Sequence, residues 1–295
     1  MFHPCLVHIW TRMSTRRHWI LGTALLGLLL GSGCGTVAST TRPATQAFGE
    51  LILSPEDEKK LGDQLAAEVK QKEKVLNDPQ VQSYVNTVGQ RLVAQSPKKE
   101  RPFPFDFTVI DAPDTVNAFA LPGGHIFVYS GLIRAAGNED ELAAVLGHET
   151  AHVTSGHPRQ QLASQVGLST LSQLVLGKNP NLIAQLASAI TAQGYLAANS
   201  REMENEADKR GLQYLDEAGY DPAAMPRFFG TLAKLEHSQP NIVSSFLATH
   251  PATPERVKTV NALIQSRGYG GGQEAIVSHD FQSIQARVGG PMISK

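Results

Sequence analysis

The stretch GHETAHVTSGH, from Gly147 to His157, gathers three histidines and one glutamate within eleven residues. Its first part, His148 to His152, follows the pattern H-E-x-x-H. Residues four apart lie one above the other on an α-helix, so both imidazoles can bind one zinc ion. Glu149 projects beside them, where it can accept a proton from a water that the metal activates. The stretch therefore predicts a metal-binding helix, and the sequence around it tests that prediction.

The residues around the motif predict an amphipathic helix. Asn138 is a typical N-cap residue, and Gly156 is suited to end the helix. Between them, apolar side chains recur on one face, at Leu142, Val145, Leu146 and Val153. The motif therefore lies late in a helix that has one buried face.

A β region precedes this helix. Residues 105–111, FDFTVID, alternate between apolar and polar side chains. Residues 116–122 and 125–130 flank Pro122-Gly123-Gly124, where a tight turn or hairpin belongs. With helices expected elsewhere, these segments predict an α+β fold that is mainly helical, with a small β-sheet beside the motif helix.

Helices are expected on both sides of this centre. Ser54-Pro55 and Asp78-Pro79 each open a helix before the β region. Residues 160–198 predict a helical hairpin, neither half of which is long or apolar enough for a membrane span. Three more helices are expected from Arg201 onward, ending near residues 218, 237 and 264.

Composition and charge narrow the class of protein. Hydrophobic residues make up 41% of the 295 and charged residues 18%, as in ordinary globular proteins. The formal net charge is −1 and no basic stripe is present, so no nucleic acid is expected as a partner. Both cysteines, Cys5 and Cys34, lie near the start of the chain. The body of the chain offers no thiolate, so a metal there must be bound by His, Asp or Glu.

The N-terminus has the layout of a secretory signal peptide. Two arginines precede an apolar run from Trp19 to Leu30, which is too short for a comfortable membrane span. The following Leu-Gly-Ser-Gly-Cys resembles a bacterial lipobox, although glycine occupies a place that is usually aliphatic. We therefore expect residues 1–34 to be a signal peptide, with translation starting at Met1 or Met13, and Cys34 to carry lipid. The alternative is a plain signal peptide with an incidental cysteine.

A tether follows the expected lipid anchor. Residues 35–53 are rich in Thr, Ser, Ala and Gly, which predicts a flexible linker between the anchor and the fold. Gly35, directly after the cysteine, resembles the pattern that sorts bacterial lipoproteins to the outer membrane. The expected location is the periplasmic face of that membrane, and the alternative is a soluble periplasmic protein.

The third metal ligand is not fixed by spacing. A catalytic zinc usually has three protein ligands and one open position. His157 is the nearest candidate, but it lies one residue short of the place that a metzincin requires. Further along, NSREMENEADKRG offers a group of carboxylates: Glu202, Glu204, Glu206 and Asp208. One of them can bind the metal while Asp208 holds the second ring nitrogen of His148. The alternative is a solvated acidic face.

Four motifs together resemble a known family. HETAH, NAFALPGG, SREMENEAD and THPATPER, in this order, are similar to the gluzincin metallopeptidases that include the CaaX prenyl proteases and bacterial HtpX. The likeness is strongest to the soluble periplasmic branch, the BepA-like proteases, and it covers about residues 54–264. We expect neither the transmembrane hairpins of the membrane branch nor the helical repeat domain of BepA in this sequence.

The resemblance implies roles for particular residues. The family pattern R-x-x-E-x-x-A-D begins at Arg201, which implies that Glu204 is the third ligand and that Asp208 orients a ligand. One zinc ion per chain is then bound by His148, His152 and Glu204, with Glu149 as general base.

Two further segments gain roles from the same resemblance. Asn117 and Ala118 are expected in an edge strand near the zinc, where an extended substrate can pair by β-addition. His250, in THPATPER, is expected either to occupy the open position of the zinc and hold the enzyme latent, or to stabilise the oxyanion. The alternative is an ordinary loop histidine before a turn.

The expected function follows from these roles. Residues 54–265 are expected to form a zinc metalloendopeptidase domain, and residues 266–295 a tail that has little to pack and is partly disordered. The resemblance implies that the substrates are unfolded or misassembled proteins of the bacterial envelope. The rival prediction is an envelope-assembly or chaperone-like factor that binds such proteins and rarely cleaves them.

Overall fold

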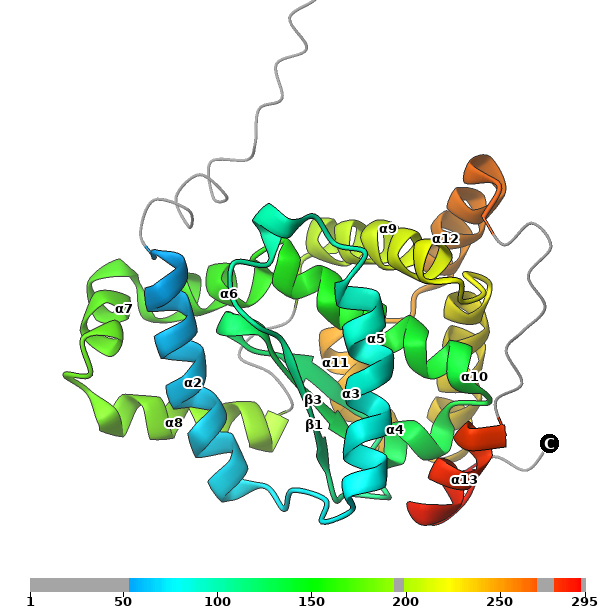
Figure 1. Cartoon of the computed structure of the whole chain (residues 1–295), viewed down its shortest axis with the longest axis horizontal. Coiled ribbons are helices and arrows are strands. Elements are labelled where there is room, and N and C mark those ends of the chain that lie inside the picture. The colour runs from blue at the N-terminus through cyan, green and yellow to red at the C-terminus, as the bar shows by residue number, and fades with distance from the viewer. Residues whose placement is uncertain (1–52, 194–198, 270–278, 293–295) are drawn as a thin grey trace, which may run out of the picture. The chain divides into compact units, whose positions relative to one another are not determined.

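Figure 1 shows the computed structural model, which describes residues 53–193, 199–269 and 279–292. The expected signal peptide, Cys34 and almost all of the expected tether lie outside these residues. Besides the strands and the motif helix, the described chain forms α2 (Pro55–Lys72), α3 (Pro79–Val93), η1 (Lys98–Glu100), α4 (Ser130–Ala135), α6 (His157–Val166), α7 (Leu168–Val175), α8 (Pro180–Gln193), α9 (Arg201–Ala218), α10 (Ala224–Ser238), α11 (Pro240–Thr249), α12 (Pro254–Arg267) and α13 (His279–Arg287). The α+β, mainly helical fold class is confirmed.

The β region forms one sheet. Its strands are β1 (Asp106–Ile110), β2 (Ala118–Ala120) and β3 (His125–Tyr129), in the order β1-β3-β2. β1 runs parallel to β3, and β2 runs antiparallel to it with Phe119 opposite Phe127. In the described part of the chain, β2 is therefore an edge strand that pairs only with β3.

The turn between β2 and β3 is the one expected from its glycines. It is a short 3-10 turn, η2 (Pro122–Gly124), in which Gly123 has a φ of 79° and Gly124 a φ of 91°. Such left-handed conformations favour glycine because it has no Cβ. A Cβ on Gly123 would also come within 3.0 Å of the Lys59 Cα in α2. The glycines therefore fix both the turn and the close packing of α2 against it.

Two hydrophobic cores cover the two faces of the sheet, because side chains alternate along each strand. In β3, Ile126 and Val128 belong to one core, and Phe127 and Tyr129 to the other. The first core is shared with α3, α5, α9 and α10, whereas the second is shared with α2, α7 and α8. These two sets of helices can be followed in Figure 1.

The motif helix is α5 (Glu139–Thr154), and it lies at the centre of the helical layer. Its N-cap Asn138 accepts a hydrogen bond from the Glu141 backbone N–H at 3.0 Å. Every residue of α5 is buried, so the helix is enclosed on all sides rather than along the single face that we expected. It packs against α3, α9, α10 and β2. This enclosure explains how the polar motif can lie inside the protein.

The number of helices after α5 differs from the number that we expected. The first half of the expected hairpin is divided at Gly167 into α6 and α7, and α8 forms the second half. After α9 and α10 the chain forms α11, a helix of ten residues that we did not expect. It matters for the site because its C-cap residue is His250.

The tail also differs from expectation. Helix α13 lies within residues 266–295, which were expected to have little to pack. Phe281 and Ile284 of this helix, together with Val288 directly after it, are buried in the first core. Arg287 adds an ion pair to Asp78, the N-cap of α3, at 2.7 Å. The described part of the tail is therefore packed against α3, because its helix carries an apolar face of its own.

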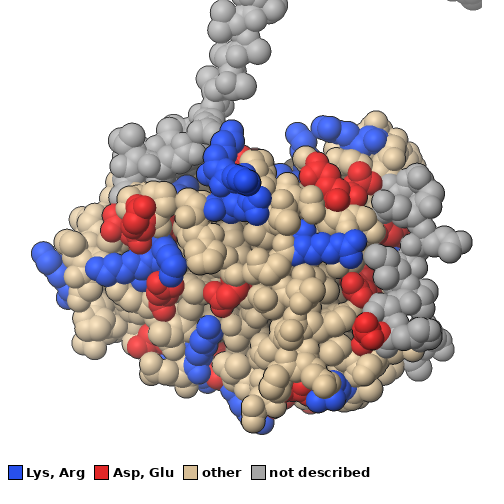
Figure 2. Space-filling view, in the orientation of Figure 1, with Lys and Arg blue, Asp and Glu red and all other residues tan. Residues whose placement is uncertain are grey.

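Two observations concern the surface. Among the described residues, no helix combines the length and apolarity needed to cross a membrane. On the face seen in Figure 2, basic and acidic side chains are interspersed among uncharged ones.

Candidate metal centre

The packing of α5 against α9 brings the histidines of the H-E-x-x-H motif close to the acidic residues of α9. Gly147 and Gly211 lie at this crossing, and a Cβ on Gly211 would approach the His148 backbone nitrogen to 3.2 Å. The absence of side chains there lets the two helices pack closely. As a result Glu204 of α9 faces the histidines of α5, although 52 positions separate it from His152.

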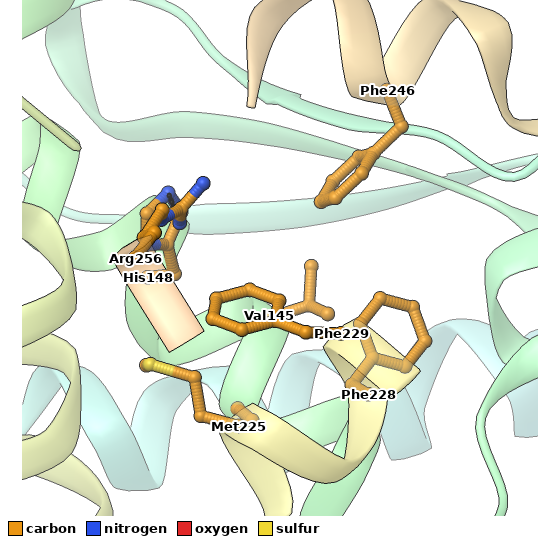
Figure 3. A pocket seen from close by; sticks show the side chains of 8 residues that line it. Val145, His148, Met225, Phe228, Phe229, Phe246 and Arg256 are labelled. Atoms are coloured by element: carbon orange, nitrogen blue, oxygen red, sulfur yellow. Dashed lines mark hydrogen bonds between the residues drawn. The ribbon is translucent and has the colours of Figure 1, made fainter. Parts of the chain in front are cut away.

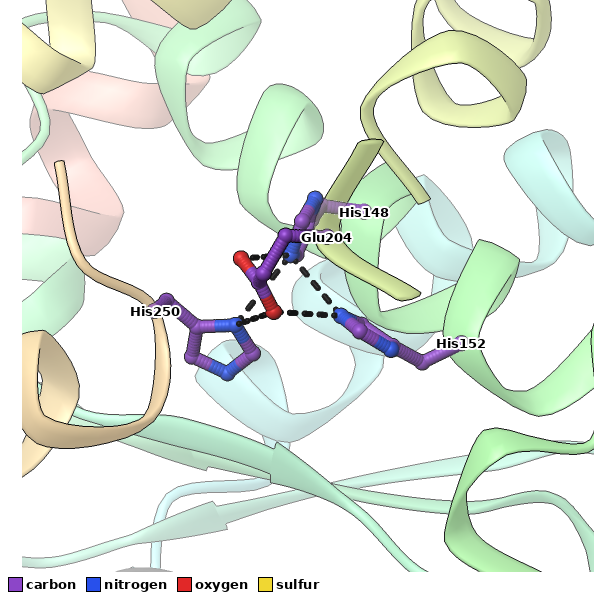
Figure 4. Close-up of side chains that lie close together, drawn as sticks. All are labelled: His148, His152, Glu204 and His250. Carbon is purple, nitrogen blue, oxygen red and sulfur yellow. Dashed lines mark hydrogen bonds and ion pairs between the residues drawn. The ribbon is translucent and has the colours of Figure 1, made fainter. Parts of the chain in front are cut away.

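Four side chains converge in Figure 4: His148, His152, Glu204 and His250. One donor atom from each lies within 4.8 Å of the others, and all four residues are buried. The Nε2 atoms of His148 and His152 are 3.0 Å apart. Glu204 Oε1 lies 3.3 Å from His152 Nε2 and 2.9 Å from His250 Nδ1. The structure therefore unites the sequence-predicted ligands with His250 in one cluster.

The spacing of these donor atoms fits a tetrahedral metal ion. Zinc ligands at about 2.0–2.1 Å from the ion lie roughly 3.3 Å from one another in a tetrahedron. The distances in the cluster include the 3.2 Å between His148 Nε2 and His250 Nδ1, and they fall close to this value. Three imidazole nitrogens and one carboxylate oxygen are also a donor set that suits zinc. The residues present thus fit the metal that the motif implies.

Opposite charges are balanced within the cluster. Burial tends to raise the pKa of Glu204, but the charges of His250 and His148 outweigh it and hold that pKa well below its usual range. Burial tends to lower the pKa of His148, but Glu204 and the hydrogen bond with Asp208 raise it to about 9. Burial lowers the pKa of His152 well below its usual range. Zinc binds the neutral imidazole, so the ion would have to displace the proton that Glu204 and Asp208 favour on His148.

Asp208 lies where the sequence analysis expected it. Its Oδ1 is 3.0 Å from Nδ1 of His148, on the ring side away from the cluster. This contact fixes the orientation of the ring and leaves Nε2 free to face Glu204 and His152.

Arg256 is a residue of this site that the sequence analysis missed. Its guanidinium is buried between Asp208 and Glu204, with Nη1 2.6 Å from Glu204 Oε2. It also lies over the ring of Phe229, 4.8 Å from the centroid. An arginine in the first turn of a helix usually faces solvent, so its place in THPATPER gave no separate signal.

Glu149 lies beside the cluster without joining it. Its side chain is 1% exposed, and Oε1 is 3.4 Å from His250 Nε2. Burial raises the pKa of Glu149. A carboxylate with a raised pKa takes up a proton more readily than an exposed one, which suits a general base.

The other candidate ligands lie elsewhere. Glu202 is exposed on α9, and Glu206 is half-buried with its Oε2 3.7 Å from His157 Nε2. His157 contributes no donor atom to the cluster, because its Nδ1 is 2.8 Å from the outer nitrogen of His152.

The expected edge strand is present. Ala118 begins β2 and Asn117 directly precedes it, and both side chains are buried. The backbone is occupied on one side by β3, and Val116 donates a hydrogen bond to Ile242 of α11 at 2.9 Å. The pairing edge of β2 is therefore bounded by the helix that leads to His250.

An apolar pocket lies beside the cluster (Figure 3). It is lined by Ala144, Val145, His148, Met225, Phe228, Phe229, Phe246 and Arg256. The ring of Phe246, on α11, lies 4.9 Å from the ring of His250. The same helix therefore supplies one wall of the pocket and one member of the cluster. A second pocket, lined mainly by polar side chains, borders Glu204 and Arg256.

The combination of a buried H-E-x-x-H helix, a facing glutamate and a small sheet is that of a metallopeptidase. The chain belongs to Peptidase family M48, whose profile matches residues 79–264. The family resemblance indicated by the four motifs is confirmed.

Individual relatives agree with this assignment. The chain is 35% identical over 258 residues to the beta-barrel assembly-enhancing protease of Yersinia pestis, covering 81% of this chain and 52% of that protein. It is 30% identical over 253 residues to the protein of the same name from Escherichia coli K12, covering 81% and 50%. The mitochondrial metalloendopeptidase OMA1 of Schizosaccharomyces pombe is 34% identical over 177 residues, covering 60% and 51%. The chain thus spans about half the length of these relatives.

Proposed function

We propose that this protein is a zinc-dependent endopeptidase that hydrolyses peptide bonds of unfolded or misassembled proteins in the bacterial envelope. The observation that carries the proposal is the buried cluster of His148, His152 and Glu204 with Glu149 beside it. Its donor spacing suits one tetrahedral zinc ion per chain. The names of the bacterial relatives, beta-barrel assembly-enhancing proteases, support an envelope substrate.

When bound, zinc supplies Lewis-acid chemistry, because it polarises a carbonyl and lowers the pKa of water. The residues of the chain have separate tasks around it. His148, His152 and Glu204 hold the ion, and Asp208 fixes the ring of His148 through Nδ1. Glu149 accepts a proton from the attacking water and passes it to the amine that leaves when the peptide bond breaks. Its buried place keeps competing bulk water away from that carboxylate.

His250 is the residue that would control the catalytic activity of the site. Its Nδ1 lies 2.9 Å from Glu204 Oε1 and 3.3 Å from Asn199 Nδ2, where it would serve as a fourth ligand to the metal. A four-coordinate zinc with no open position resembles a structural site rather than a catalytic one. We therefore take this arrangement as the latent state, which opens when a substrate or partner moves α11.

Substrate would bind as an extended strand. The backbone near Asn117 and Ala118 supports β-addition, since β2 pairs with only one strand in the described chain. The apolar side chains that line the small pocket beside His148 would form the wall of a subsite for an apolar side chain of the substrate once α11 has moved. Such side chains are exposed in unfolded and misassembled proteins, which is consistent with a quality-control role.

Anchoring is the second part of the proposal. A lipid on Cys34, followed by the tether at residues 35–53, would hold the peptidase at the periplasmic face of the outer membrane. Labelled palmitate should be incorporated into the wild-type protein and not into Cys34→Ser, which should become soluble in the periplasm. A mature N-terminus at another residue, without lipid, would instead support the alternative of a soluble periplasmic protein.

The rival function is a binding factor with little proteolysis. The observation in its favour is that His250 is the fourth member of the cluster, which would leave no open position on the metal. Zinc content and casein cleavage, measured on the same sample with and without a chelator, separate the two. One zinc per chain with chelator-sensitive cleavage supports the peptidase. Binding of unfolded casein with no cleavage at any zinc content supports the rival.

A further inference from the structure

His157 is buried directly behind His152. It is 2% exposed, and its ring meets the ring of His152 edge-on, with centroids 4.9 Å apart and planes at 67°. The Nδ1 atoms of the two rings are 2.8 Å apart. Because Nε2 of His152 faces the cluster, this ring is held between the cluster on one side and His157 on the other.

A fixed carboxylate stands behind His157. Glu206 Oε2 lies 3.7 Å from Nε2 of His157. Its other oxygen accepts hydrogen bonds from the Ser155 hydroxyl at 3.0 Å and from Arg210 Nε at 3.1 Å. These contacts fix the Glu206 carboxylate in a place that faces Nε2 of His157.

The short contact between the two rings determines where the protons lie. Two nitrogens 2.8 Å apart need one proton between them, since two lone pairs or two N–H groups would repel. A metal on Nε2 of His152 requires a lone pair there, which leaves the proton of His152 on Nδ1. His152 Nδ1–H must then donate a hydrogen bond to Nδ1 of His157. The ring proton of His157 therefore lies on Nε2, which faces Glu206.

We infer that His157 is a positioning residue for His152. Glu206 holds His157 in the tautomer whose Nδ1 accepts a hydrogen bond from His152. The inference rests on the proposed function, because it assigns the tautomers by placing a metal on His152. The two motif histidines are then held by different partners. Asp208 contacts His148 directly, whereas a carboxylate reaches His152 only through a second imidazole.

The local backbone accounts for this placement. Gly156 has a φ of 73° between the C-cap of α5 and the first residue of α6. This left-handed residue turns the chain sharply, so His157 at the start of α6 lies beneath His152 one turn earlier in α5. The stretch HVTSGH therefore encodes a metal ligand, its turn and its positioning partner within six residues.

The test compares two substitutions of one side chain. His157→Phe keeps a ring of similar volume and removes both nitrogens, whereas His157→Asn keeps an acceptor oxygen near the place of Nδ1. Zinc affinity is measured by competition with a chelator. Loss of an outer partner of a metal ligand typically weakens affinity by about 10–100-fold, so His157→Phe should show such a loss. His157→Asn should recover most of it, a rescue that a packing role does not produce.

Control variants and a spectroscopic readout complete the design. Glu206→Gln should weaken zinc binding less than His157→Phe, and Glu202→Gln, on the exposed side of the same helix, should not change it. In the zinc-loaded wild type, ¹⁵N resonances should identify His157 with its proton on Nε2. A proton on Nδ1 of His157 would overturn the inference.

The outcomes separate this inference from the proposed function. If wild-type protein binds zinc and His157→Phe binds it equally well, His157 is only a packing residue and the peptidase proposal stands. If wild-type protein binds no zinc, the proposed function fails and this inference fails with it. Thermal unfolding of the metal-free variants shows whether each one folds. Should His157→Phe not fold, the comparison of His157→Asn with wild type and the tautomer of His157 decide the matter.

Discussion

Arg256 donates two hydrogen bonds to Asp208, from Nε to Oδ2 at 2.6 Å and from Nη2 to Oδ1 at 2.7 Å. Both side chains are buried, and the third guanidinium nitrogen lies 2.6 Å from Glu204. Paired, planar contacts of this kind restrict both partners in angle as well as in distance. Arg256 thus ties α12 to the carboxylate that orients His148 and to the carboxylate of the cluster.

Removal of this arginine should destabilise the fold. Arg256→Met keeps much of the side-chain volume but leaves two buried carboxylates without their cation. Breaking a buried pair in this way typically costs about 3–5 kcal/mol. Urea unfolding of the metal-free protein should show a loss of that size. Arg267→Met, at the exposed end of the same helix, should change stability by less than about 0.5 kcal/mol. Equal stability of the two variants would contradict the structural role given to Arg256.

Glu149→Gln should separate metal binding from catalysis. The amide keeps the size of the side chain but cannot accept the proton of the attacking water. Zinc content should remain at the wild-type value, while peptide turnover falls by at least about 10²–10⁴-fold, the usual contribution of a general base. Both quantities are measured on one preparation. Retained turnover would remove Glu149 from the mechanism.

The identity of the carboxylate ligand can be tested by an alanine series along α9. Glu204→Ala should sharply lower zinc content, because its Oε1 faces both His152 and His250. Glu202→Ala should retain the metal, because Glu202 is exposed. Glu206→Ala should retain most of it, because this residue acts only through His157. Zinc loss on Glu202→Ala with retention on Glu204→Ala would show that the ligand was chosen wrongly.

The motif helix and the sheet were predictable because their signals are local. Residues four apart share a helix face, alternation defines a strand, and Gly123 marks the turn. Glu204 was different, since spacing left several acidic residues open and only the family resemblance selected one. What brings Glu204 to the histidines is the close crossing of α5 and α9 at Gly147 and Gly211. A contact of this kind is not visible in sequence periodicity.

Other features of the site depend on tertiary packing in the same way. Arg256 became part of the site because α12 packs against α9, which buries a charge that usually faces solvent. Spacing suggests His157 only as a possible ligand, because its contact with His152 requires the turn at Gly156. Helix α11 is short and lacks a side-chain N-cap, so Pro240 at its first position is its only capping signal.

Glu206 should make the stability of the fold depend on acid pH. Its pKa is lowered from an ordinary value of 4.5 to about 2, so its contribution to stability is complete above pH 4.5. This contribution decreases as pH falls through about 2, where the folded state also binds the proton. The difference in Tm between wild type and Glu206→Gln should therefore be largest near neutral pH and shrink toward pH 2. Glu236→Gln, at an exposed site on α10, should show no such trend, and a constant difference for Glu206→Gln would contradict the argument.

His250 should govern the basal activity of the enzyme. It is the C-cap residue of α11, and its backbone N–H is bonded to Phe246 at 2.8 Å. The metal-binding cluster and the apolar pocket are therefore both bordered by the short helix α11. His250→Ala should raise basal cleavage of unfolded casein several-fold, since the fourth place becomes free for water. Zinc affinity should fall only modestly, because three ligands remain.

A second substitution distinguishes latency from a direct part in the reaction. Phe246→Ala leaves the imidazole in the chain but removes the wall that α11 gives to the pocket. If α11 must move before hydrolysis, this variant should also raise basal cleavage, with zinc affinity unchanged. If His250 instead stabilises the oxyanion, its removal should lower kcat by about 10²–10³-fold while Phe246→Ala changes mainly KM. Loss of activity in His250→Ala together with full activity in Phe246→Ala would therefore end the latency proposal and leave His250 as a group that acts on the substrate.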